Sequence, residues 1–168
     1  LEEMRAKWPR IATKYLKSDS LQDILFMPDY PHVDEGSGNY DDEDSEEEGC
    51  QSCDRIMVVK RRTREFRVHH GLVASGNQVI KDALFRDRLN KDLGGHVLCV
   101  EMEAAGLSQD FPCLIIRGIC DYADSHKNKK WQEHAAAAAA AFAKELLAYV
   151  QPSEVDRDRP VVDILRQG

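Results

Sequence analysis

The sequence lacks any apolar run near the roughly 20 residues that span a bilayer, and it shows no secretory signal peptide. We therefore expect no membrane segment. It also lacks an even set of cysteines, since there are five, and Cys99, Cys113 and Cys120 lie in or beside apolar runs. This usage favours buried, reduced thiols over a disulfide framework, and it indicates a reducing, cytoplasmic setting.

An excess of positive charge is missing too, because the net charge is −7. Nine acidic residues and no basic ones lie between positions 34 and 48, and they account for more than this whole net charge. The balance argues against nucleic acid as a partner but excludes no small anionic substrate. Residues 34–49 carry almost no apolar side chains, so we expect a disordered surface loop there.

The chain lacks an initiating methionine and starts inside what reads as the end of an amphipathic helix, residues 1–8, ended by Pro9. We interpret it as a piece of a longer polypeptide. Residues 1–66 are expected to hold this helix end and an irregular insertion with the acidic loop. Residues 67–151 form the regular part, and residues 152–168 a tail or linker.

From residue 67 onward, apolar runs alternate with helical patterns. The expected strands are residues 68–75, 96–100 and 113–116, and the expected helices are residues 79–93, 102–109 and 132–150. The seven alanines at 135–141 predict close packing of the last helix against a sheet. Because apolar strands that alternate with helices are typical of covered parallel sheets, we predict an α/β fold.

Polar groups follow all three expected strands: Ser75-Gly76-Asn77, then Glu101-Met102-Glu103, then Arg117 to Asp121. Burying unpaired charge costs several kcal/mol, so packing seldom explains such groups. The carboxyl ends of parallel strands share one edge, where ligands bind. The sequence therefore predicts a site for a polar substrate at this edge.

Residues 71–77 (GLVASGN), 100–104 (VEMEA) and 117–121 (RGICD) closely resemble the purine nucleoside phosphorylase and methylthioadenosine/S-adenosylhomocysteine nucleosidase superfamily. Residues 121–129 (DYADSHKNK) are similar to its fungal branch, where the domain lies beside an NTPase module and helical repeats in a multidomain protein. The resemblance implies the C-terminal part of a phosphorylase/hydrolase-like three-layer fold, with a mostly parallel β-sheet flanked by helices. It also implies purine nucleoside cleavage without a cofactor, with phosphate as the alternative acceptor to water.

The resemblance also implies roles for single residues. Glu103 would accept hydrogen bonds from the ribose hydroxyls, and Asp121 would assist protonation of purine N7, so these two are the catalytic candidates. Breaking an N-glycosidic bond builds positive charge on the sugar and negative charge on the base, which suits a carboxylate and an acid in these places. The substrate-binding candidates are Glu101, Met102, Arg117, Val79, Ile80, Asn77, Ser75 and Cys120.

Three positions depart from the family pattern. Val79 replaces the aromatic that stacks on the purine, Cys120 replaces a serine, and Asn77 stands where many nucleosidases have Asp. The family's N-terminal half, with its phosphate or water site, has no visible counterpart, so we expect the chain alone to be inactive. Since family members commonly pair subunits at the site, we expect a homo-oligomer.

Two alternative functions stay open. One is cleavage of a nucleotide such as ATP, which requires Lys or Arg near the strand ends to hold the phosphates. The other is a catalytically silent nucleoside-sensing module, which Val79 and Cys120 favour and which the joint presence of Glu103, Arg117 and Asp121 disfavours.

Three further features have less specific patterns. Cys50-Gln51-Ser52-Cys53 is half of a zinc knuckle, with His32 as a third candidate ligand, but a free thiol pair is the alternative and we predict no metal. The basic run at residues 60–67 is interpreted as a solvated face. His69 and His70 point to opposite faces of a strand, which favours structural roles.

Overall fold

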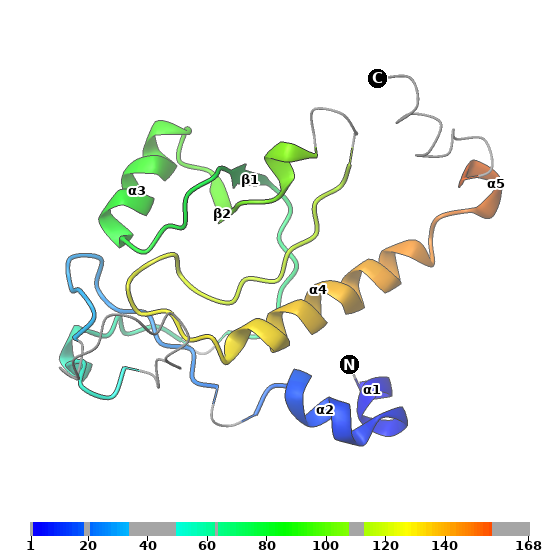
Figure 1. Ribbon diagram of the computed structural model, residues 1–168, viewed down its shortest axis with the longest axis horizontal. Helices are drawn as coiled ribbons and strands as arrows, with labels where there is room; N and C mark the ends of the chain where they lie inside the picture. The colour runs from blue at the N-terminus through cyan, green and yellow to red at the C-terminus, as the bar shows by residue number, and fades with distance from the viewer. Residues whose placement is uncertain (1, 19–20, 34–49, 63, 108–112, 156–168) are drawn as a thin grey trace.

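The computed structural model describes residues 2–18, 21–33, 50–62, 64–107 and 113–155 (Figure 1). Its helices are α1 (Glu2–Lys7), α2 (Pro9–Tyr15), α3 (Ala83–Asp92), α4 (Trp131–Leu147) and α5 (Pro152–Val155), with 3-10 turns η1 (Arg55–Met57) and η2 (Ala104–Gly106). Strands β1 (Leu72–Ser75) and β2 (Val97–Glu101) pair in parallel. The mixed α/β class is as predicted. The expected acidic loop at residues 34–49 lies outside the described residues.

The unit β1–α3–β2 follows the predicted order with shorter elements. Asp82 caps α3, because its Oδ1 accepts the amide hydrogen of Phe85 at 3.0 Å. Gly94 and Gly95 end the helix with φ angles of 94° and 79°, a conformation that favours glycine. The two parallel strands then bring Ser75 opposite Glu101.

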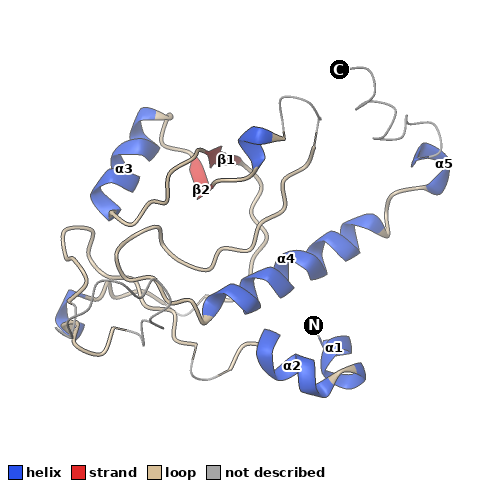
Figure 2. Cartoon of the chain, viewed as in Figure 1, coloured by secondary structure: helices blue, strands red, loops and turns tan. Residues whose placement is uncertain are grey.

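The predicted strand at residues 113–116 is wrong. These residues are described, but they form no strand and no backbone hydrogen bond to another described segment. A strand needs a partner for its ladder, and apolar composition alone supplies none. Residues 113–130 instead run as a long loop between the sheet and α4, as Figure 2 shows.

Two other helix predictions need correction. The helix expected at residues 1–8 is α1, which ends at Lys7 before Pro9, but a second helix, α2, begins at Pro9 where an irregular chain was expected. Proline suits the first position of a helix because the amide hydrogen that it lacks would have no partner there. The helix expected at residues 102–109 is replaced, where the chain is described, by the single turn η2.

Helix α4 packs through its alanines. Ala135 and Ala138 are buried, and a Cβ placed on Gly118 would overlap the backbone carbonyl of Ala135. The loop thus lies directly on the helix backbone, an approach that requires small residues on both sides. The sequence predicts close packing of this helix against a sheet, whereas the close packing at Gly118 is against this loop.

The segments before and after residues 34–49 pair with each other. Phe26 and Val58 form an antiparallel bridge, flanked by bonds from Met27 N to Met57 O (2.9 Å) and from Val59 N to Leu25 O (2.8 Å). Phe26 is the one large side chain below 2 % exposure among the described residues.

Several large apolar side chains stay exposed outside this small core, among them Leu98, Leu114 and Ile119. The expectation that Cys113 is buried is wrong, because its residue is exposed, while Cys99 and Cys120 are half-buried. Among the described helices, none combines the length and apolar character that a membrane crossing demands.

Candidate active site at the strand ends

The ends of β1 and β2 meet at one edge. Ser75 pairs with Glu101 in the parallel register, and Gly76 N donates to Glu101 O at 3.0 Å. Ser75 Oγ accepts the amide hydrogen of Ala105 at 2.8 Å, which joins the end of β1 to the turn after β2. Two of the three predicted polar groups therefore lie side by side.

Glu101 is buried and organises the turn that follows β2. Its Oε2 accepts the amide hydrogens of Glu103 and Ala104, both at 2.9 Å. Burial by itself raises the pKa of Glu101, but hydrogen bonds from Ser75 and from these two amides outweigh it and lower the pKa to about 2. Its other oxygen, Oε1, is buried and has no hydrogen-bond partner among the described residues.

Arg117 joins the loop after residue 113 to both glutamates. Its guanidinium donates to Glu103 Oε2 and lies 3.6 Å from Glu101 Oε2. The Glu103 side chain is 66 % exposed, whereas that of Glu101 is 1 % exposed. Glu103 is thus the carboxylate that a ligand from solvent can reach, and Arg117 orients it.

Asp121 lies in a separate polar group. Its Oδ1 accepts the amide hydrogen of Ala123 at 2.8 Å, and its Oδ2 lies 3.3 Å from Lys127 Nζ and 3.6 Å from Cys120 Sγ. Burial, followed by the neighbouring Asp121, raises the pKa of Cys120. Ala123 has a φ of 52°, a strained conformation for alanine of the kind that gathers at functional sites.

Met102 joins the first group through its backbone, because its amide donates to Glu103 Oε2 at 3.3 Å, while its side chain is exposed. Asn77 and Val79 are exposed and Ile80 is half-buried in the connection between β1 and α3. Among the described residues, no contact links Asp121 to Glu103.

A cavity of about 1580 Å³ connects the two groups through Arg117 and Asp121, which both line it. Its basic lining residues include Arg61, Arg62, Arg64, Arg67 and Lys130. This volume exceeds the roughly 300–1,000 Å³ of ordinary ligand pockets. No local sequence pattern predicts that the basic run and Asp121 line the same cavity, because the run and the loop meet only through tertiary folding.

Lys60, Arg62, Arg64 and Arg67 are exposed, as the interpretation of that run as a solvated face expects, but Arg61 is an exception. It pairs with Asp23 at 2.5 Å, lies 4.9 Å from the centre of the Tyr122 ring, and is mostly buried. Burial, followed by a hydrogen bond to Asp23, raises the pKa of Tyr122. Arg61 therefore supports the loop that carries Asp121.

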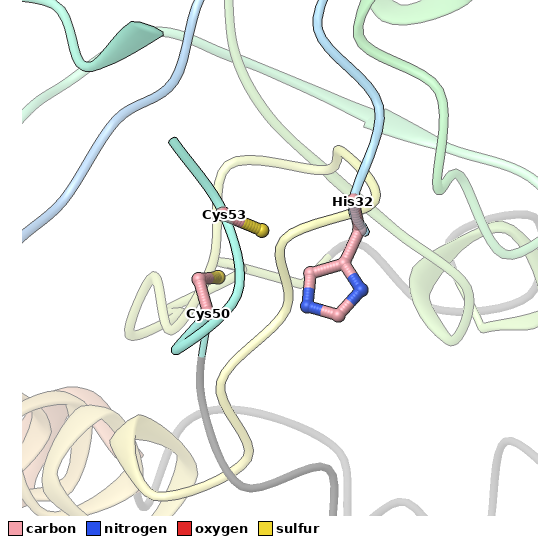
Figure 3. A group of neighbouring side chains, drawn as sticks. All are labelled: His32, Cys50 and Cys53. Carbon is pink, nitrogen blue, oxygen red and sulfur yellow. The ribbon is translucent and has the colours of Figure 1, made fainter. Parts of the chain in front are cut away.

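The candidate metal ligands do come together. Atoms of His32, Cys50 and Cys53 lie within 4.8 Å of one another (Figure 3). Burial, followed by the neighbouring Cys53, raises the pKa of Cys50 to about 11. This cluster is distinct from the Arg117–Glu103 pair.

The sequence matches the phosphorylase superfamily over residues 11–151. The chain therefore belongs to this superfamily, and the parallel strands, the motif order and the strand-end glutamates are consistent with it. The match starts at residue 11, so the likeness extends into the stretch that the sequence pattern assigned to an insertion. The division of the chain at residue 67 stays a prediction.

Three relatives add detail. A nucleotide-binding leucine-rich repeat (NLR)-like protein of Hyaloscypha variabilis is 48% identical over 122 residues, which are 71% of this chain and 12% of that protein. Two 5'-methylthioadenosine/S-adenosylhomocysteine nucleosidases, from Mycobacterium bovis and Mycobacterium tuberculosis, are 32% identical over 89 residues. Those residues are 50% of this chain and 34% of each nucleosidase. No solved structure matches the chain.

Proposed function

We propose that this chain supplies part of an active site that cleaves the N-glycosidic bond of purine nucleosides. The observation that carries the proposal is the group in which Arg117, from the loop after residue 113, meets Glu101 and Glu103 at the end of β2. It combines one ionised, buried carboxylate that holds a turn with one exposed carboxylate that an arginine orients. Superfamily membership and the two nucleosidase relatives support the same reaction class.

On the sugar side, Glu103 accepts hydrogen bonds from ribose hydroxyls. Both oxygens of its exposed carboxylate can accept hydrogen bonds, and Arg117 orients one of them, Oε2. Negative charge beside the ribose stabilises the cationic sugar of the transition state. Met102 provides an adaptable apolar surface next to it.

On the base side, Asp121 assists protonation of purine N7: its carboxylate takes up a proton from solvent and passes it to N7, so that the base leaves as a neutral group and the carboxylate is restored. Lys127, 3.3 Å from Asp121 Oδ2, holds the carboxylate in position before the substrate binds. Val79 and Ile80 flank the base from the other side.

The acceptor is water or phosphate, and no cofactor takes part. The chain acts within a larger cytoplasmic protein that has linked NTPase or repeat domains, and paired copies complete the site. The NLR-like relative, of which the matched residues are 12%, supports the linked domains. The chain alone is then inactive.

One observation favours a second candidate, cleavage of a nucleotide such as ATP. Arg62, Arg64 and Arg67 line the same cavity as Asp121, where they can hold phosphates. In that case Arg64→Ala reduces cleavage of ATP and leaves cleavage of adenosine unchanged.

The test measures free base released by the intact protein from adenosine, inosine, methylthioadenosine and ATP, with and without phosphate. We expect Glu103→Ala and Asp121→Asn each to reduce turnover by at least about a hundredfold, the scale of a lost acid–base or positioning group.

Asp92→Asn, at the far end of α3, is the matched control and keeps full activity. Near-normal turnover in both site variants would contradict the assignment. Tight nucleoside binding by the wild type without any base release would establish the silent sensing module instead.

A further inference from the structure

Three metal-binding side chains from two separate segments meet beside the Asp121 loop, residues 121–130. Figure 3 shows the thiols of Cys50 and Cys53 and the imidazole of His32 directed toward one another. No disulfide joins the cysteines. Two sulfurs and an imidazole nitrogen are a donor set that favours tetrahedral Zn²⁺.

The spacing suits a metal after a small adjustment. These donor atoms lie within 4.8 Å of one another. Ligands of tetrahedral zinc lie about 3.3–3.8 Å apart, as bond lengths of about 2.0–2.3 Å require. Side-chain rotation alone covers a difference of this size.

The backbone around the cluster is held without a metal. The bridge between Phe26 and Val58 fixes the two segments that carry the ligands. Tyr30 Oη also accepts the amide hydrogen of Asp54 at 2.8 Å, next to Cys53. Cys53 itself is buried. The donors therefore sit on a preformed support, which lowers the cost of gathering them around an ion.

A second observation points to a ligand at this place. His126 Nε2 is buried and has no hydrogen-bond partner among the described residues. Its ring centre lies 5.5 Å from that of His32, and it stacks on Phe26 at 4.0 Å. Buried nitrogens without a partner are rare in native proteins, and a bound metal satisfies one. His126 would complete four-fold coordination.

We propose that His32, Cys50, Cys53 and His126 bind one Zn²⁺ and thereby anchor the Asp121 loop. The loop already contacts the cluster, because His32 N donates to Ser125 Oγ at 3.0 Å. Asp124, buried next to Ser125, accepts the amide hydrogen of His126 at 2.9 Å. A metal at this point ties the segments before and after residues 34–49 to the loop that carries Asp121 and Lys127. The role of this metal is structural, and the proposal that it binds does not depend on the proposed cleavage reaction.

The test measures the metal content of the intact protein, purified in reductant without chelator, by native mass spectrometry and elemental analysis. We expect one Zn²⁺ per chain in the wild type and none with Cys50→Ser. Cys113→Ser, an exposed cysteine outside the cluster, is the matched control and retains the ion. His126→Ala removes one of the four ligands, so it weakens Zn²⁺ binding by more than the roughly tenfold that the loss of a supporting residue costs.

A second measurement avoids variants that fail to fold. Co²⁺ added to the metal-depleted wild type should give the visible absorption of a tetrahedral thiolate site, and Zn²⁺ should abolish it. Absence of both bound Zn²⁺ and this absorption would overturn the proposal. Equal Zn²⁺ content in Cys50→Ser, or a Cys50–Cys53 disulfide in the reduced protein, would do so too. None of these readouts uses a nucleoside, so failure here leaves the proposed function untouched.

Discussion

Two glutamates two positions apart occupy opposite environments at the end of β2. Glu101 faces inward and binds backbone amides, whereas Glu103 faces solvent and binds Arg117. Strand alternation alone would put residues two positions apart on the same face, so the difference arises because β2 ends at Glu101 and the chain turns before Glu103. One carboxylate therefore stabilises the turn while the other stays available to a ligand.

Glu101→Gln tests this division of labour. The variant keeps the size of the side chain but loses the charge that accepts the amide hydrogens, so the free energy of unfolding at pH 7 should fall by about 1–3 kcal/mol. The pKa of Glu101 in the folded protein, about 2, lies below the ordinary glutamate pKa of 4.5, which applies in the unfolded chain. The charge therefore stabilises the fold above pH 4.5. This contribution is lost as the pH falls from 4.5 toward 2. Urea unfolding across this range measures it.

Glu145→Gln, an exposed position on α4, is the control and should change stability little at any pH. A difference between wild type and Glu101→Gln that is unchanged at pH 3 would contradict the charged state of Glu101.

At the scale of elements, the contact between α4 and the loop at Gly118 depends on the absence of a side chain. A methyl group there overlaps the Ala135 carbonyl, which belongs to the helix backbone and has little freedom to move. The loop and helix must separate to accept it, and the bonds of Asp121 and Arg117 lie on either side of this point.

Gly118→Ala should therefore lower the free energy of unfolding by about 2–3 kcal/mol, as other overpacking changes do. Gly106→Ala is the matched control, because a Cβ there meets nothing within 4 Å and its φ is not left-handed. Thermal unfolding of both variants gives the comparison. Equal melting temperatures would mean that the loop does not rest on α4.

The elements that local sequence predicts are those with local causes. Helix α4 follows from its alanines, and β1 and β2 from short apolar runs that end in polar groups. The strand at residues 113–116 failed because a ladder needs a partner, which composition does not reveal. The pattern does not predict α2, because Pro9 marks the end of one helix and proline also starts helices.

For the whole molecule, the pairing of Ser75 with Glu101 followed from parallel strand ends that share an edge, whereas Arg117 reaches Glu101 and Glu103 from a loop and not from the strand expected before it. The place of the basic run beside Asp121 did not follow from the strand ends, because it depends on contacts between residues far apart in sequence, such as Arg61 with Tyr122. The nearness of His126 to His32 is hidden for the same reason. The spacing in the sequence identifies Cys50 and Cys53 as candidate metal ligands, but it does not reveal which other segments of the chain surround them.

The exposed apolar side chains lead to a prediction about association. Leu114, 73 % exposed, lies within residues 113–116, which form no backbone hydrogen bond to another described segment. We expect the isolated chain to form dimers or larger species with rising concentration, and Leu114→Lys to weaken this association at least about tenfold. Analytical ultracentrifugation measures both.

Ile56→Lys is the control, since Ile56 is also exposed but sits on η1, away from that loop. A wild-type chain that stays monomeric at high concentration would contradict the expectation.

The pairing of residues 25–27 with 57–59 has a consequence for engineering. It joins the described segments on both sides of residues 34–49, so those two segments stay paired whatever sequence lies between them. Doubling the length of a loop between fixed ends costs only about 0.6 kcal/mol. We therefore expect that a fluorescent reporter or an affinity peptide can replace residues 34–49 with little cost to the fold, at a place in the sequence beside His32 and Cys50.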